Sequence, residues 1–199
     1  MGNLRSVQKA FETVGVSAII SNDHEIIKNA DKLVLPGVGS FKDGIKHLHE
    51  LKLIDILNEE VLQKKKPFLG ICLGMQLIAS KGYENGETKG LNWVEAEVIK
   101  FNFSNSTHQL KVPHVGWNEL LFYNSNILLQ DIKEFSDFYF VHSYYFKTQE
   151  NIVTSYTNYG IKFTSSIQKN NIFAFQFHPE KSQEVGLKII ENFVKLEII

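Results

Sequence analysis

The chain has little of what builds a disulfide scaffold, a strongly charged surface or a membrane span. Its 199 residues include one cysteine, Cys72, so no disulfide can form within the chain, which fits a reducing compartment. Lys and Arg number 21 and Asp and Glu number 22, so the net charge of −1 gives no electrostatic reason to expect nucleic acid or an anionic membrane as a partner. No run approaches the ~20 apolar residues of a membrane span, and the first residues lack the apolar core of a signal peptide. We therefore expect a cytoplasmic protein.

What remains is the composition of an ordinary globular protein. Hydrophobic residues make up 43% of the chain and charged residues 22%, enough apolar material for a sizeable core. The length suits one compact unit, so we expect a single domain over residues 1–199. The sequence shows neither a cluster of metal ligands nor a nucleotide-binding loop, and we expect no cofactor.

The first half alternates helical and strand patterns with short links. Apolar spacing predicts helices over residues 4–14, 41–63 and 72–80, and short apolar runs predict strands over 16–20, 32–35 and 67–71. This alternation is typical of an α/β fold with a mostly parallel central sheet and helices on both faces.

The second half is rich in Val, Ile, Phe, Tyr and Thr and predicts additional antiparallel strands. The runs 138–146, 152–156, 163–168 and 172–177 are separated by polar turns. A final helix is predicted over residues 183–196, where apolar side chains share one face.

Cys72 has the surroundings of a nucleophile. It lies in Gly70-Ile71-Cys72-Leu73-Gly74, after a predicted strand and before a predicted helix, which is the context of a nucleophile elbow. The glycines let the backbone turn sharply, and a helix N-terminus near the thiol favours the reactive thiolate. An isolated cysteine would more often be buried and inert. The spacing favours the nucleophile.

A base for this thiol is found near the end of the last predicted strand. His178 follows the run 172–177, and Pro179 ends the strand pattern. Glu180 lies two residues further on and could hold the imidazole in the required tautomer. On its own, a His-Pro pair would more often be a surface turn.

Backbone donors for an oxyanion are expected at two places. One is the amide of Leu73, directly after the nucleophile, and the other is the loop Gly37-Val38-Gly39 after the second predicted strand. Glycines in this loop permit unusual backbone angles and a close approach to substrate. The alternative is an ordinary Pro-Gly turn. A phosphate cradle is excluded because no Gly-Lys-Ser/Thr sequence follows.

These motifs, together with three others, resemble the class I (triad) glutamine amidotransferases. The matching segments are MGNLRS at 1–6, LPGVGSF at 35–41, GICLGMQL at 70–77, PHVGWN at 113–118, FYFVHSY at 138–144 and FQFHPEKS at 175–182. They follow the family's order along the whole chain, and their joint occurrence is highly specific. Within the family the chain is most similar to the glutaminase subunits of imidazole glycerol phosphate synthases, from histidine biosynthesis.

The resemblance implies that L-glutamine is hydrolysed to glutamate and ammonia through a thioester on Cys72, with His178 as base and Glu180 orienting it. It implies oxyanion donors at Val38, Gly39 and Leu73, glutamine contacts at Gly37, Gln76, Ser143 and Tyr144, and partner contacts at Asn3, Tyr139 and Lys181. Family members form a heterodimer with a barrel-shaped cyclase subunit. Ammonia reaches that subunit through a protected channel, where it closes the imidazole ring.

Four other interpretations stay open at this point. Paralogues with the same motifs supply ammonia for amidination of bacterial surface sugars. Other class I amidotransferases serve chorismate or pyridoxal synthesis, although PHVGWN and FVHSY argue against them. A non-catalytic regulatory or binding module with this fold would be expected to lose a triad residue, and none is lost. A cysteine hydrolase without a partner would show full glutaminase activity alone.

The sequence departs from the family's pattern at its N-terminus. Family chains usually begin with a hydrophobic strand and an Asp-Tyr-Gly-like turn before the Gly-Asn motif, and here Met1 falls where that turn would be. We expect the true start to lie upstream, by roughly ten residues, the length of a strand and a turn. Each large apolar side chain left uncovered would cost about 1.5–3 kcal/mol.

A chain extended by that upstream strand should therefore be more stable than the 199-residue chain. Thermal melts of the two chains, recorded side by side by circular dichroism, compare them directly. Equal melting temperatures would contradict the expectation.

Overall fold

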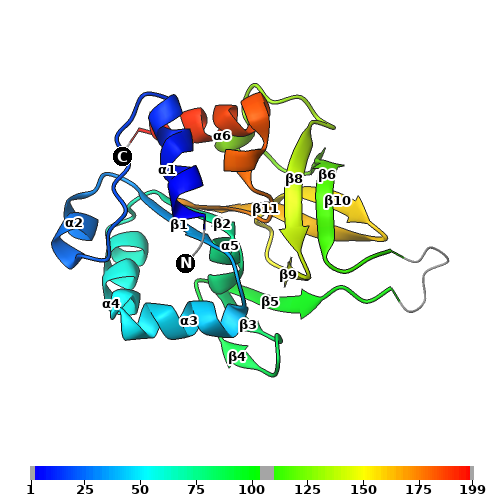
Figure 1. Ribbon diagram of the computed structural model, residues 1–199, viewed down its shortest axis with the longest axis horizontal. Coiled ribbons are helices and arrows are strands. Elements are labelled where there is room, and N and C mark those ends of the chain that lie inside the picture. Colours follow the sequence, from blue (N-terminus) through cyan, green and yellow to red (C-terminus); the bar gives the residue numbers. More distant parts are fainter. Residues whose placement is uncertain (1–2, 104–109, 198–199) are drawn as a thin grey trace.

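A mixed sheet forms the centre of the molecule, and helices cover both of its faces (Figure 1). The computed structural model describes residues 3–103 and 110–197. The helical segments are α1 (Leu4–Thr13), α2 (His24–Asn29), α3 (Phe41–Glu50), α4 (Leu53–Leu57), the π-helical η1 (Asn58–Gln63), α5 (Leu73–Leu77), the 3-10 turns η2 (Ile127–Leu129) and η3 (Pro179–Lys181), and α6 (Gln183–Lys195). The strands are β1 (Leu33–Gly37), β2 (Phe68–Cys72), β3 (Ala79–Gly82), β4 (Thr88–Lys89), β5 (Val94–Lys100), β6 (His114–Glu119), β7 (Leu121–Phe122), β8 (Asp137–His142), β9 (Tyr144–Thr148), β10 (Val153–Tyr159), β11 (Ile161–Lys169) and β12 (Ile172–Phe175).

The strand order confirms an α/β fold in which antiparallel strands extend a parallel part. The order of strands in the main sheet is β1-β2-β12-β11-β9-β5-β3-β4. Beside this row, β10 pairs with β11, and β7 pairs with β10. β2 lies between β1 and β12 and pairs in parallel with both, and β3 is parallel to β5. β6 and β8 form a separate antiparallel pair. The carboxyl ends of β1, β2 and β12 therefore meet at one edge of the sheet.

Alternate residues of the central strands enter two different cores. In β2, Phe68 packs with α3 and α4, whereas Leu69 and Ile71 pack with α1 and α6. Phe173 and Phe175 of β12 enter the same core as Leu69 and Ile71. Figure 1 shows α1 and α6 together on one side and α3 and α4 on the other. The period of two along a strand thus buries both faces of the sheet.

Three of the sequence predictions for the first half of the chain are wrong in detail. Residues 16–20 form no strand, and Ile19 and Ile20 are 71% and 46% exposed, because a strand exists only where another strand pairs with it. The predicted helix 41–63 is interrupted at Lys52, whose backbone is left-handed with φ of 54°. The predicted helix 72–80 ends at Leu77, and the chain continues as β3.

One short helix escaped the sequence analysis. The Asp23 side chain accepts hydrogen bonds from the amides of Glu25 and Ile26 and so caps α2. An Asp followed by a Glu in the first turn is a helix-start signal. The signal was present, but six residues give too little periodicity to detect.

The predicted strand 138–146 is divided at Ser143. β8 ends at His142 and pairs with β6, whereas β9 begins at Tyr144 and pairs with β5 in the main sheet. The chain therefore crosses from one sheet to the other at Ser143, beside the carboxyl edge of β2.

None of the helices formed by residues 3–103 and 110–197 is long and apolar enough to cross a membrane.

Candidate active site

Cys72 sits on a strained turn between β2 and α5. Its φ of 54° and ψ of −107° lie outside the regions that ordinary residues prefer, and its side chain is 6% exposed. A Cβ atom on Gly74 would lie 1.7 Å from the carbonyl oxygen of Leu35, and one on Gly70 would lie 2.9 Å from the carbonyl oxygen of Gly74. Both glycines of the Gly-x-Cys-x-Gly motif are therefore required by close backbone contacts.

The loop predicted to hold an oxyanion lies directly beside the thiol-bearing residue. Gly37, the last residue of β1, is in register with Cys72, the last residue of β2. Val38 follows and is 39% exposed, and Gly39 has a φ of 106° that favours glycine. A Cβ on Gly37 would lie 3.0 Å from the Cβ of Leu73, so the loop packs against the start of α5. The structure brings Gly37, Val38, Gly39 and Leu73 together beside Cys72. The roles of Val38, Gly39 and Leu73 as oxyanion donors and of Gly37 as a glutamine contact remain proposals.

His178 and Glu180 form a buried pair after β12. His178 is 1% exposed, and its Nδ1 donates a hydrogen bond to Oε1 of Glu180 at 2.7 Å. The backbone amide of His178 donates to the carbonyl of Tyr139 at 2.9 Å, which fixes the residue against β8. Nε2 of His178 has no hydrogen-bond partner among the described residues. Cys72 and Glu180 are the two groups whose interactions raise the pKa of this ring, and Glu180 occupies Nδ1, so we expect Nε2 to face the thiol.

Asn3 is brought to the same carboxylate. Its Nδ2 donates to Oε1 of Glu180, so that oxygen accepts from both Asn3 and His178. Sequence analysis assigned Asn3 to a partner interface and missed this contact, which joins residues 177 positions apart. The other two expected interface residues lie close by, with Nζ of Lys181 5.6 Å from the ring centre of Tyr139. Asn3 thus restrains the group that orients the base.

The electrostatics of His178 favour its charged form. Burial alone lowers the pKa of His178, but the hydrogen-bonding and charge interactions with Cys72 and Glu180 outweigh it and raise that pKa to about 9. At neutral pH the imidazole is therefore held as a cation between a thiol and a carboxylate. This arrangement favours a thiolate–imidazolium pair.

Gln76 and Gln176 connect the thiol to the junction between the sheets. Nε2 of Gln76 donates to the carbonyl of Tyr144 at 2.9 Å and to Oε1 of Gln176 at 3.0 Å. Nε2 of Gln176 in turn lies 3.8 Å from Sγ of Cys72. Sequence analysis named Gln76, Ser143 and Tyr144 but missed Gln176. The available signal in the sequence was a glutamine between two phenylalanines in a strand pattern. In the structure this glutamine is fully buried.

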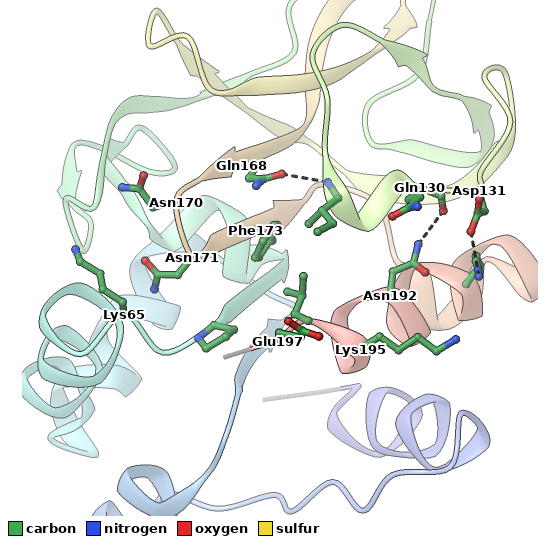
Figure 2. A pocket seen from close by; sticks show the side chains of 14 residues that line it. Lys65, Gln130, Asp131, Gln168, Asn170, Asn171, Phe173, Asn192, Lys195 and Glu197 are labelled. Carbon is green, nitrogen blue, oxygen red and sulfur yellow. Dashed lines mark hydrogen bonds and ion pairs between the residues drawn. The ribbon is translucent and has the colours of Figure 1, made fainter. Parts of the chain in front are cut away.

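A surface cavity of about 710 Å³ lies at the opposite edge of the sheet (Figure 2). Pro67, which precedes β2, and Asn171, which precedes β12, line it, whereas Cys72 is the last residue of β2 and His178 follows the carboxyl end of β12. Asn171 and Asn192 both use their Nδ2 atoms on backbone carbonyls of the protein itself. The cavity is thus separate from the thiol site, and much of its polar lining is already engaged.

Comparison with known proteins shows the family of the chain. The family model described as "Glutamine amidotransferase class-I" matches residues 2–196. The chain belongs to the class I glutamine amidotransferases.

Within that family, the chain is similar to proteins named imidazole glycerol phosphate synthase subunit HisH. The protein of that name from Campylobacter jejuni (strain 81-176), numbered HisH 1, is 53% identical over 98% of this chain and 96% of its own length. The one from Aquifex aeolicus is 49% identical over 97% of this chain and 91% of its own length. The similarity therefore extends over nearly the full length of these proteins.

Solved structures support the fold at lower identity. A crystal structure described as a glutamine amidotransferase superposes with a TM-score of 0.71 at 18% identity, covering 97% of this chain and 95% of its own. The structure of PurLQS from Thermotoga maritima gives a TM-score of 0.68 at 16% identity, covering 96% and 91%. At such identities the likeness concerns the fold alone.

The raised pKa of His178 makes the stability of the fold depend on pH. The cationic imidazole is favoured in the folded state, so its contribution is fully present below the unfolded value of 6.5 and is lost as pH rises through about 9. We expect the free energy of unfolding to decrease as pH rises toward about 9, because the imidazolium is favoured in the folded state. Urea denaturation at a series of pH values measures it.

Two substitutions test whether His178 is the group that causes this pH dependence of stability. His178→Asn should flatten the profile, whereas His47→Asn, at an exposed position on α3, should leave it unchanged. A wild-type profile that is already flat between pH 7 and 9 would contradict the assignment.

Proposed function

We propose that this chain is the glutaminase subunit of an imidazole glycerol phosphate synthase, hydrolysing L-glutamine to glutamate and ammonia for histidine biosynthesis. The observation that carries the proposal is the only cysteine of the chain on a strained elbow beside the buried His178–Glu180 pair. The near full-length similarity to proteins named as that subunit supports the pathway.

In the first half-reaction, the Cys72 thiolate attacks the side-chain amide carbon of glutamine. The tetrahedral intermediate carries an oxyanion, for which the amides of Leu73 and of the Val38–Gly39 loop are the proposed donors. The imidazolium of His178 gives its proton to the departing nitrogen, the C–N bond breaks, and ammonia leaves. A thioester between Cys72 and the glutamyl group remains.

In the second half-reaction, water replaces the sulfur. Neutral His178 accepts a proton from the attacking water, and the new C–O bond forms as the C–S bond breaks. Glutamate leaves and the thiolate–imidazolium pair is restored. Glu180, held by Asn3, keeps Nδ1 of His178 protonated, so Nε2 performs both transfers. The reaction uses protein groups and water and requires no cofactor.

Glutamine is proposed to bind between the Gly37 loop and the junction between the sheets. Gln76 comes from the helix after the nucleophile, and Ser143 and Tyr144 come from the crossing between β8 and β9. The backbone carbonyl of Val141 lies 3.9 Å from Sγ of Cys72, so this crossing is adjacent to the thiol. Substrate held here would present its amide carbon to Cys72.

The relatives are named as subunits of a synthase, so a partner subunit is implied. We propose a barrel-shaped cyclase as that partner, in a cytoplasmic heterodimer, with this chain as a single domain. Asn3, Tyr139 and Lys181 are the proposed contact residues; Lys181 lies over the Tyr139 ring, and Asn3 donates to Glu180. Ammonia in neutral water would be mostly protonated and no longer nucleophilic, so a shielded passage to the cyclase preserves its reactivity.

Glutamate release by the purified chain tests the proposed chemistry. We expect low activity alone and higher activity with a cyclase subunit and its ribotide ligand. Cys72→Ala should abolish the activity, by on the order of a thousandfold or more. Because Cys72 is the only cysteine, alkylation by iodoacetamide should add one label, and glutamine should slow that labelling.

A histidine pair provides the matched control for the base. His178→Asn should lose the activity while His47→Asn, on the exposed face of α3, keeps it. Full activity of Cys72→Ala would exclude the thioester route. Full activity of the chain without a partner would favour a free-standing hydrolase.

The pathway is tested separately by growth. The chain, expressed with a cyclase subunit, should restore growth without histidine to a strain that lacks its own glutaminase subunit. Cys72→Ala should fail to restore it. Glutaminase activity in vitro without complementation would favour the paralogue that supplies ammonia for sugar amidination.

A further inference from the structure

Two buried histidines lie beside the site and take no part in the proposed chemistry. His114 of β6 and His142 of β8 are opposite each other in register, and they are 2% and 5% exposed. Nδ1 of His114 is 3.2 Å from Nε2 of His142. The His114 ring is stacked between Phe140 at 5.0 Å and Tyr159 at 4.0 Å. β6 and β8 lie side by side in Figure 1.

The hydrogen bonds around the pair permit only one arrangement of protons. Nδ1 of His142 lies 2.8 Å from the carbonyl oxygen of Tyr144, which can only accept, so Nδ1 carries the proton. A neutral His142 ring then accepts at Nε2, and Nδ1 of His114 must be the donor. Burial keeps both rings neutral, since it lowers the pKa of His114 to about 4 and that of His142 to about 3.

Asn118 begins this chain of donors. Its Nδ2 is 3.3 Å from Nε2 of His114, which is left as an acceptor. The same Nδ2 also donates to the carbonyl of Asn158 at 3.0 Å, and Oδ1 accepts from the amide of Glu119 at 2.9 Å. The side-chain amide of Asn118 therefore has one orientation. Donation runs in one direction, from Asn118 through the two rings to the Tyr144 carbonyl.

The Tyr144 carbonyl is where this chain meets the nucleophile. It accepts from His142 and also from Nε2 of Gln76 at 2.9 Å. The same Gln76 nitrogen donates to Gln176, which lies against the thiol of Cys72. Loss of either donor would leave this carbonyl with one hydrogen bond fewer at the point where the chain crosses between the sheets.

We propose that His114 and His142 are positioning residues for glutamine binding: through the Tyr144 carbonyl they fix the Ser143–Tyr144 backbone and the Gln76 amide in the arrangement that receives the substrate. This rests on the proposed function, because it concerns how that function's substrate is held. In this positioning role neither histidine contacts the reacting atoms. The pair acts through the backbone between β8 and β9.

The proton arrangement can be observed directly in the unmodified chain. In ¹⁵N spectra of the histidine side chains, both His114 and His142 should appear as neutral rings protonated at Nδ1. Spectra of His114→Phe and His142→Phe assign the signals. A ring protonated at Nε2 at either position would overturn the proposal, whatever the activity of the chain.

Kinetics of the complex with its partner test the consequence. His114→Phe keeps an aromatic ring between Phe140 and Tyr159 but removes the donor to His142. We expect KM for glutamine to rise about tenfold, the loss of roughly one hydrogen bond, with kcat nearly unchanged. In His114→Asn the amide can donate from near the former Nδ1 position, and KM should stay near the wild-type value.

Thermal melts separate positioning from folding. A wild-type KM in His114→Phe, or an equal rise in His114→Asn and His114→Phe, would overturn the proposal. If His114→Phe does not fold, His142→Phe removes the donor to the Tyr144 carbonyl and should raise KM, whereas His142→Asn should keep it near the wild-type value; the tautomers decide independently. Inactivity of the wild-type complex would instead refute the proposed function. The ¹⁵N spectra test the proton arrangement independently of that function.

Discussion

The start of α5 lies so close to β1 that only a hydrogen atom fits between Gly74 and the Leu35 carbonyl, where a Cβ would be 1.7 Å from the oxygen. This contact draws the chain after Cys72 back across the sheet edge. Cys72 then takes up a φ of 54°, and the surrounding packing holds that strain. The parallel register that pairs Gly37 with Cys72 places the glycine loop beside the thiol. Nucleophile and proposed oxyanion loop are thus positioned by one backbone contact.

Most of the polar side chains of the site are buried, and each needs a specific partner because an unpaired buried group is costly. Glu180 pairs with Asn3 and His178, and Gln176 pairs with Gln76. Burial acts on the histidines in opposite ways. The interactions of His178 with Cys72 and Glu180 raise its pKa, whereas burial among aromatic rings lowers the pKa of His142, whose polar partners are a carbonyl and the His114 ring. One protein interior therefore holds a charged base and a neutral histidine pair close together.

Sequence reasoning succeeded where local pattern determines geometry. The Gly-x-Cys-x-Gly spacing indicated the elbow, and His178 and Glu180, two residues apart, were expected to meet and do. It failed where a contact joins distant segments. Nothing near Asn3 in the sequence points to Glu180, and a run such as 16–20 forms a strand only if a partner pairs with it. The orientations of His114 and Asn118 likewise depend on β8 and β10, which no local pattern describes.

The small β6–β8 sheet touches both halves of the catalytic machinery. The carbonyl of Tyr139 accepts from the amide of His178, and the carbonyl of Val141 lies 3.9 Å from the thiol of Cys72. The same sheet exposes Val115 and Trp117, 55% and 47% accessible, and Trp117 packs beside Tyr139. A partner that shifted this sheet would move base, thiol and glutamine contacts together, because the chain enters the main sheet directly at Ser143.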